Sequence, residues 1–302
     1  MIRRAVIGAV LALASAALAI QAAALKYEHG QLLRLDPRDE SVWAGATHIE
    51  VSRQAKQFRR IVIRDFSLSA AGTLAVSASA SFNAGVNTNV VLLFNARLPA
   101  EPPKVLTTGD VFCEHLAWGQ SRLWCLGPDF RRMVASQPYA VLWQIGLDGD
   151  LKPVLHRDQF ALNAAPPWKT AALGDAQLMV NGETAWIWHP GAGSVIRLAS
   201  QPNEPARFGV SGSVAGRSRI SMAVWGERIA ALLPVRTEGE ETFTTPYALF
   251  ALDPSQHQWV RISPTLLPRG AQLLAVEDGK AVVWDRRGKG QLLRKEIEYP
   301  SR

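Results

Sequence analysis

The stretch QLMVNGETAWIW, residues 177–188, places two apolar runs on either side of a turn that contains a glycine. In the second run Trp186 and Trp188 fall on the same side of an extended chain, because side chains alternate along a strand. Two short apolar runs joined by a glycine turn are typical of an antiparallel β-hairpin. We therefore predict a hairpin with its turn at Gly182.

The same pattern recurs along the chain. It is found in FSLSAAGTLAVSA (66–78), HLAWGQSRLWCL (115–126), SMAVWGERIAAL (221–232) and QLLAVEDGKAVVW (272–284). The turn glycines Gly72, Gly119, Gly182, Gly226 and Gly279 are separated by 47, 63, 44 and 53 residues. A second pair of strands follows several hairpins, as in 89–107 and 139–156. Four-stranded units of about 50 residues that recur without helices between them predict an all-β fold, a β-propeller.

Five hairpins predict five four-stranded blades, or six if residues 44–66 or 157–176 contain a degenerate unit. The last unit, 272–300, offers only two or three strands, and residues 31–43 offer strands with no inner hairpin before them. Exposed sheet edges favour aggregation, and closure of a propeller removes them. We therefore predict that the amino- and carboxyl-terminal strands pair in one final blade.

A second motif supports this interpretation. YALFALDPSQHQWVRIS (247–263) is echoed in shorter form by LLRLDPRDESVW (32–43), and both are interpreted as outer hairpins. Pro254 fixes its own φ, and Asp253 can accept hydrogen bonds from the backbone that follows it. The spacing of Asp253, Pro254 and Trp259 resembles the outer hairpin of kelch-type propellers. The resemblance implies the fold and carries over no functional residue.

Residues 1–24 have the layout of a secretory signal. Arg3 and Arg4 precede an apolar stretch, 5–20, and small residues with A-x-A spacing follow. We expect this signal peptide to be removed, which leaves 25–302 as a single propeller domain that is periplasmic or secreted. The alternative is an uncleaved anchor, because the apolar stretch is only slightly shorter than a membrane span of about 20 residues.

Cys113 and Cys125 are the two cysteines of the chain. A hairpin centred on Gly119 places them opposite each other, and in an oxidising compartment this predicts a disulfide bond. The alternative is a pair of buried free thiols. Zinc is disfavoured, because His115 adds only a third ligand where a structural site needs four.

The sequence contains no common catalytic or cofactor motif. G-x-S-x-G, H-E-x-x-H, the P-loop and G-x-G-x-x-G are all missing, so we predict no cofactor and no metal, and the catalytic residues stay unassigned. The net charge is +7, but the basic residues are dispersed, so no nucleic-acid partner is expected. The Gly/Ser-rich stretch 209–218 and the acidic residues Glu238, Glu240 and Glu241 are interpreted as solvated loops.

Tryptophan is unusually frequent, with ten residues against four tyrosines. Eight of them fall in or beside predicted strands: Trp118, Trp124, Trp143, Trp186, Trp188, Trp225, Trp259 and Trp284. We interpret them as packing between blades. The alternative is an aromatic platform for sugars or peptides.

Export, repeats and missing motifs together predict a non-catalytic propeller that binds a protein, glycan or other cell-envelope partner through its loops. The alternative is a secreted hydrolase or lyase acting on glycans, with carboxylates from several blades around the central channel. Asp65, Glu114 and Glu183 are the candidates for such carboxylates. A redox or cofactor-binding propeller has no supporting motif. Contact with a membrane is expected only if the amino-terminal segment is retained.

Overall fold

The computed structural model describes residues 25–36, 38–82, 85–134, 139–157, 173, 176–189, 193–198, 205–210, 220–235, 246–268, 270–286 and 290–297. The predicted signal peptide, the acidic loop 238–241, and most of the stretches 157–176 and 209–218 lie outside these residues. The chain divides into two compact units, Met1–Gly109 and Asp110–Arg302, and each is described by itself. No helix in the described ranges is long and apolar enough to cross a membrane.

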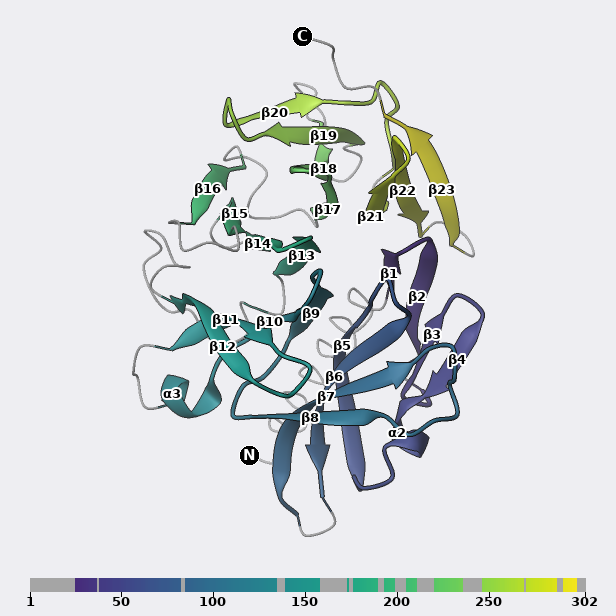
Figure 1. Cartoon of the computed structure of the whole chain (residues 1–302). Helices are drawn as coiled ribbons and strands as arrows, with labels where there is room; N and C mark the ends of the chain where they lie inside the picture. The colour runs from purple at the N-terminus through teal and green to yellow at the C-terminus, as the bar shows by residue number, and fades with distance from the viewer. Residues whose placement is uncertain are drawn as a thin grey trace, which may run out of the picture. The chain divides into compact units, whose positions relative to one another are not determined.

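The first unit contains two four-stranded antiparallel sheets, in which the strands follow one another in chain order (Figure 1). The first blade is β1 (Leu25–Glu28), β2 (Gln31–Asp36), β3 (Ser41–Ala44) and β4 (Thr47–Glu50). The second is β5 (Arg60–Leu68), β6 (Thr73–Ser81), β7 (Asn87–Asn95) and β8 (Lys104–Gly109). A one-turn helix, α2 (Val51–Gln54), lies between them in the sequence.

The second unit contains four further antiparallel sheets, three with four strands and one with three among the described strands. The third blade is β9 (His115–Trp118), β10 (Leu123–Leu126), β11 (Ala140–Ile145) and β12 (Leu151–His156), with α3 (Phe130–Val134) inside it. The fourth is β13 (Gln177–Asn181), β14 (Thr184–His189), β15 (Ser194–Leu198) and β16 (Ala206–Gly209). The fifth is β17 (Ser221–Trp225), β18 (Arg228–Pro234), β19 (Tyr247–Asp253) and β20 (Gln258–Arg261). The sixth is β21 (Gln272–Glu277), β22 (Lys280–Asp285) and β23 (Gln291–Glu296).

The predicted all-β propeller is confirmed, and it has six blades. All five hairpins expected from the glycine turns are present. The blade that was not expected is the first, residues 25–50, whose inner hairpin the sequence analysis missed. Its turn consists of only His29 and Gly30, both with positive φ, as in the two-residue turns that join short antiparallel strands.

The structure corrects the predicted shared blade. Among the described strands, β1–β4 form one complete sheet and β21–β23 another, so neither sheet contains a strand from the opposite end of the chain. The reason lies in two short segments. LKYE (25–28) supplies the inner strand that the first blade was thought to lack. The strand β23 is the third of its blade but is mostly exposed, with Arg294, Lys295 and Glu296, a composition typical of an edge strand that resists further pairing.

The two Asp-Pro segments occupy different positions. Residues 253–258 form the outer hairpin between β19 and β20, as predicted, and the Asp253 carboxylate accepts hydrogen bonds from the Ser255 amide (2.9 Å) and hydroxyl (2.6 Å). In the first blade, Asp36 accepts a similar bond from the Arg38 amide (3.1 Å), but this turn joins the central strands β2 and β3. The echo therefore reflects shared turn chemistry, and the predicted outer hairpin at 32–43 is wrong.

The core lies between adjacent blades of each unit. Buried side chains join the first blade to the second, the third to the fourth, the fourth to the fifth and the fifth to the sixth. Trp124, Trp186 and Trp188 are at most 1% exposed, which confirms a packing role for them. Trp259 of the fifth blade donates its Nε1–H to the Gly209 carbonyl of the fourth (3.1 Å). The fifth blade's outer hairpin is thus attached to the neighbouring sheet.

The predicted disulfide is confirmed, with the Cα atoms of Cys113 and Cys125 5.2 Å apart. The predicted register, with Cys113 opposite Cys125 in the hairpin, is wrong. The turn closes between Gly119 and Arg122, and Cys125 pairs with Leu116 in the ladder. Cys113 instead precedes β9. There the segment before β9 runs beside the segment after β10, and the Phe112 amide donates to the Pro128 carbonyl (3.0 Å).

This close backbone approach requires a glycine at position 127. A Cβ atom there would lie 1.6 Å from the Phe112 carbonyl oxygen, so any side chain must push the two segments apart. We expect Gly127→Ala to lower the free energy of unfolding by about 2–4 kcal/mol, as measured by chemical denaturation. Gly209→Ala is the matched control, because open space surrounds that position. Equal effects of the two substitutions would contradict the crowding at Gly127.

Candidate functional site

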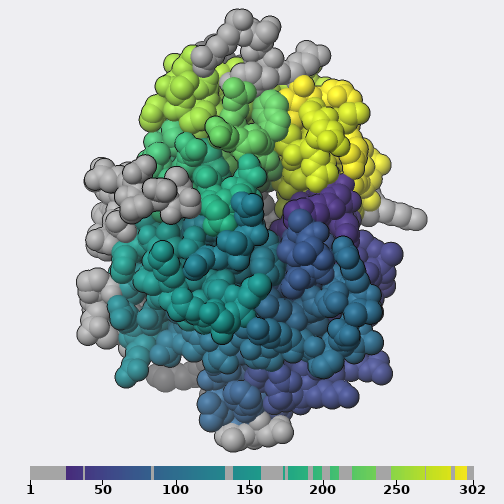
Figure 2. All heavy atoms as spheres, in the orientation of Figure 1, coloured from purple at the N-terminus to yellow at the C-terminus, as the bar shows by residue number. Residues whose placement is uncertain are grey.

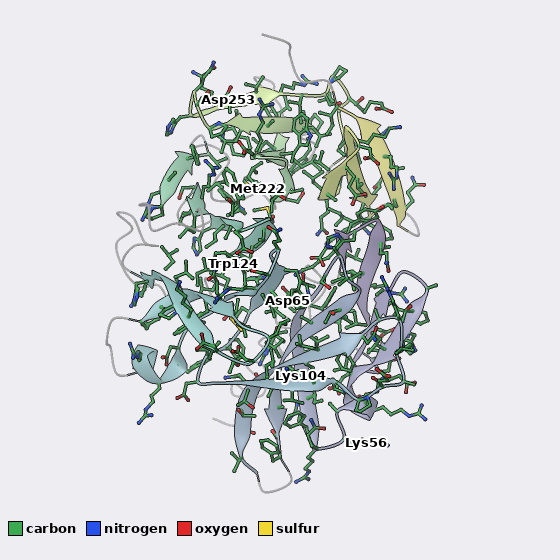
Figure 3. The ribbon with its side chains drawn as sticks, in the orientation of Figure 1. Lys56, Asp65, Lys104, Trp124, Met222 and Asp253 are labelled. Carbon is green, nitrogen blue, oxygen red and sulfur yellow. A yellow bond between two sulfur atoms is a disulfide. The ribbon has the colours of Figure 1, made fainter. Side chains whose placement is uncertain are left out.

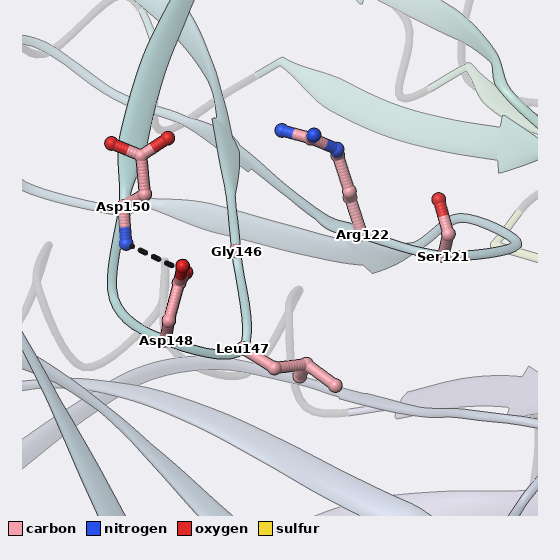
Figure 4. A pocket seen from close by; sticks show the side chains of 6 residues that line it. All are labelled: Ser121, Arg122, Gly146, Leu147, Asp148 and Asp150. Atoms are coloured by element: carbon pink, nitrogen blue, oxygen red, sulfur yellow. Dashed lines mark hydrogen bonds between the residues drawn. The ribbon is translucent and has the colours of Figure 1, made fainter.

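The turns of the third blade form an open hollow. In a sheet whose strands follow one another in antiparallel order, the first and third turns lie at the same end. The turn 119–122 and the turn 146–150 therefore lie near each other and border an open hollow of about 470 Å³ (Figure 4). Its lining residues are Ser121, Arg122, Gly146, Leu147, Asp148 and Asp150.

One of the two turns that border the hollow is bonded to the fourth blade. The Glu183 carboxylate accepts hydrogen bonds from both the amide and the hydroxyl of Ser121 (each 3.1 Å), and the Gln120 amide donates to the Gly182 carbonyl (3.0 Å). One blade further, the Asn181 side chain donates to the Gly226 carbonyl (2.7 Å). These bonds fix the inner turns of three successive blades against one another.

The polar groups of the hollow are accessible. Asp148 and Asp150 are exposed, Leu147 is 50% exposed, and a bond from the Asp150 amide to the Asp148 carboxylate (3.2 Å) fixes their turn. In Figure 4 the Arg122 and Asp150 side chains point to the same side of the two turns. An open hollow with both charge signs and one apolar side chain suits contact with a protein surface better than enclosure of a small molecule.

Acidic residues are concentrated at this end of the second unit. We use the name hairpin-turn end for the inner turns 118–122, 181–184, 225–228 and 277–280 together with the turn 146–150 that borders the hollow. Its acidic residues are Asp148, Asp150, Glu183, Glu227, Glu277 and Asp278, and its basic residues are Arg122, Arg228 and Lys280. This surplus is opposite in sign to the net charge of the whole chain, +7.

The three acids proposed from the sequence have different environments. Asp65 is buried in the first unit, where the Lys26 ammonium lies 2.6 Å from its carboxylate. Glu183 and Glu114 belong to the second unit but lie beyond opposite ends of β9: Glu183 bonds to Ser121 after that strand, and Glu114 precedes it. The structure therefore does not bring Glu114 and Glu183 together.

Sequence analysis missed a second acid beside Asp65. Glu28, at the end of β1, accepts hydrogen bonds from the Leu68 amide and the Ser67 hydroxyl (3.1 Å) of β5. Burial of its carboxyl group raises the pKa of Glu28 to about 7, and the Asp65 charge acts in the same direction. The Lys26 charge and the bonds from Leu68 and Ser67 oppose this shift.

The contacts of Glu28 favour a structural role. A side chain of one inner strand also meets the backbone of the next inner strand at two other junctions. Gln177 of β13 accepts a bond from the Met222 amide of β17 (2.9 Å) and donates to the Ile220 carbonyl (2.6 Å). Ser221 of β17 accepts a bond from the Leu273 amide of β21 (2.7 Å). Gln177 and Ser221 begin their strands whereas Glu28 ends its own, but all three accept a bond from an amide of the next inner strand, so Glu28 needs no chemistry to explain it. Figure 3 labels Asp65 and Met222, one at each of two such junctions.

The histidines do not form a metal site in the described part of the chain, where no group of three or more His, Cys, Asp or Glu side chains is arranged to hold an ion. His48 stacks on Trp43, with ring centroids 4.3 Å apart, and His257 lies against Phe208 at 5.0 Å. His115 contacts the Leu173 carbonyl through Nε2 (2.9 Å). Each of these three histidines therefore takes part in local packing or hydrogen bonding.

The raised pKa of Glu28 makes stability depend on pH. Folding favours the protonated form, since the pKa rises from 4.5 to about 7. The stabilisation is complete below about pH 4.5 and is lost as the pH rises through about 7, by up to about 3 kcal/mol. We expect Glu28→Gln, which keeps an acceptor for the Leu68 amide, to remove this pH dependence in denaturation curves. Glu296→Gln, at an exposed position, is the control, and an unchanged pH dependence in Glu28→Gln would contradict the assignment.

Comparison with known proteins finds only distant structural similarity. No family model matches it, and a search of the curated proteins found no match. Among solved structures, it is similar to the β-propeller domain of the Trilobed protease from Pyrococcus furiosus, with 10% identity and a TM-score of 0.44 over 80% of this chain and 71% of that one. A member of the duf4221 family from Bacteroides vulgatus gives 9% identity and a TM-score of 0.48 over 86% and 85%. The acylaminoacyl peptidase of Pyrococcus horikoshii gives 8% identity and a TM-score of 0.47. The matched region covers 81% of this chain but only 40% of that protein. Identities this low concern the fold alone.

Proposed function

We propose that the protein is an exported, non-catalytic propeller that binds a protein or cell-envelope partner through its loops, with the hollow of the third blade at the centre of the binding surface. The observation that carries this proposal is the hollow itself. It is open, it is formed by two turns that hydrogen bonds hold in place, and it presents Leu147, Asp148, Asp150 and Arg122 to the solvent.

The charge of the hairpin-turn end suggests the chemistry of the partner. Its six acidic residues exceed its three basic residues, so a partner segment rich in Lys or Arg would gain favourable electrostatic interactions. The exposed Leu147 offers an apolar contact within the same hollow. Arg122 provides one site for a carboxylate of the partner and would help to fix its orientation.

Export is supported by two observations. The chain carries a disulfide, which is characteristic of oxidising compartments. Its first 24 residues have the layout of a secretory signal. A periplasmic or secreted location would also make the hairpin-turn end accessible to components of the cell envelope.

A glycan-active hydrolase or lyase is the alternative function. The observation that favours it is Glu28, because a carboxyl group with a pKa of about 7 beside a second acid, Asp65, is in the range of a general acid. Against it, the Glu28 carboxylate already accepts bonds from Ser67 and Leu68, and Asp65 is paired with Lys26. Glycan hydrolysis that is abolished by Glu28→Gln at unchanged stability would favour the alternative.

Site-specific photo-crosslinking tests the binding surface. We expect a photoreactive residue at position 147 to yield a defined crosslinked product in the producing cell, since Leu147 projects into the hollow. Position 266 is the matched control, because Leu266 is equally exposed, at 51% against 50%. The double variant Asp148→Lys and Asp150→Lys should weaken binding of the partner by about tenfold or more, whereas Glu101→Lys should not.

The result that contradicts the proposal is equally specific. If position 147 gives no more crosslinking than position 266, the hollow is not the centre of a binding surface. If the charge reversal and Glu101→Lys have the same effect, the acidic turns do not select the partner.

A further inference from the structure

The second blade is longer than the others. Its strands β5, β6 and β7 contain nine residues each, whereas the other described strands contain four to seven. The outer strand β8 pairs with β7 only between Asn89 and Leu93, so the β6–β7 hairpin continues beyond it. This hairpin reaches the lower end of the view in Figure 1, and its atoms are at the surface there in Figure 2.

The end of this hairpin exposes apolar side chains. Phe82 is 38% exposed and Val86 is 59% exposed. The Phe82 amide donates to the Val86 carbonyl (3.0 Å), and the Gly85 amide donates back to the Phe82 carbonyl (3.0 Å), so the hairpin end is hydrogen-bonded on itself. One side of the Phe82 ring packs on Phe58, with ring centroids 4.9 Å apart, and Phe58 is part of the buried core. The core residue Phe58 therefore supports the exposed Phe82 side chain.

Basic residues lie next to this apolar end. Residues 51–64, VSRQAKQFRRIVIR, contain five basic residues and no acidic one. The Arg59 amide donates to the Ser81 carbonyl (2.8 Å), and Arg60 pairs with Ser81 in the sheet, which places both arginines beside the hairpin end. Lys56, Arg59 and Arg60 are all exposed, and Figure 3 shows Lys56 at the periphery of the first unit.

We propose that this basic tip, formed by Phe82, Val86, Arg59 and Arg60, docks the protein on an anionic lipid surface, and that the exposed Lys56 adds to the positive charge of the same unit. Apolar side chains at a protruding turn can enter the headgroup region, and flanking Lys and Arg side chains are attracted by lipid phosphates. With two apolar and two basic side chains at the tip, the attachment is reversible and depends on salt. The tip lies on the first unit and the hollow on the second, so this attachment does not rest on the proposed binding of a partner by the hollow.

Lipid fits the tip better than nucleic acid. A site for single-stranded nucleic acid combines a basic groove with aromatic rings on which bases stack. Here the more exposed of the two apolar residues is Val86, which has no ring, and one side of the Phe82 ring is already covered by Phe58. Insertion into a headgroup layer makes use of both side chains.

Vesicle sedimentation with the purified chain tests the proposal. We expect binding to vesicles of phosphatidylcholine mixed with phosphatidylglycerol, little binding to phosphatidylcholine alone, and a loss of about fivefold or more between about 0.05 M and about 0.5 M salt. Val86→Ser and the pair Arg59→Glu with Arg60→Glu should each reduce binding by at least about fivefold. Leu98→Ser and Lys104→Glu are matched controls on the same unit, since Leu98 is 51% exposed and Lys104 is exposed, and they should bind as the unchanged protein does.

A spectroscopic variant separates docking from loss of structure. Val86→Trp should show a blue-shifted emission with the anionic vesicles, measured as the difference from the unchanged protein because of the native tryptophans, and no shift with neutral ones. The proposal is wrong if the tip variants and the controls bind alike, if binding is independent of lipid charge, or if a single-stranded oligonucleotide binds through Arg59 and Arg60 while the vesicles do not.

Discussion

The inner edge of each blade sets the constraint on which much of this structure depends. The innermost strand of a blade is paired with a neighbouring strand on one side only, so the amide groups of its other edge need partners from outside the sheet. At three junctions between blades the partner is a side chain from the preceding inner strand. Glu28 accepts a bond from Leu68, Gln177 from Met222 and Ser221 from Leu273. Three chemically different residues thus perform the same task.

The inner turns of neighbouring blades are also bonded to one another. Ser121 of the third blade bonds to Glu183 of the fourth, and Asn181 of the fourth bonds to Gly226 of the fifth. The hollow of the third blade is bordered by two turns of that blade, and its acidic residues lie on the surface, whereas the apolar contacts lie between the sheets. The disulfide adds a covalent link between Cys113, which precedes β9, and β10 within the same blade.

The sequence predicted those features that depend on local pattern. Glycine turns between apolar runs identified five of the six inner hairpins. The two cysteines on either side of one such turn predicted the disulfide bond between them. The first blade was missed because its inner turn has only His29 and Gly30, and strands of four residues give little periodicity. The prediction of a shared terminal blade was wrong because which strands form a sheet depends on pairing between distant segments, and a local sequence pattern does not indicate such pairing. The hollow was missed for the same reason, since Arg122 and Asp150 belong to separate turns that only folding brings together.

Hydrogen exchange at the junction amides tests most directly whether side chains join the blades. In the folded protein the amides of Leu68, Met222 and Leu273 should exchange as slowly as amides paired within the sheets, although none of the described strands forms a sheet ladder with them on that edge. Gln177→Ala should accelerate exchange at Met222 and leave Leu273 unchanged. Exchange at all three amides as fast as in an exposed loop, or no effect of Gln177→Ala on Met222, would contradict this account of how the propeller is held together.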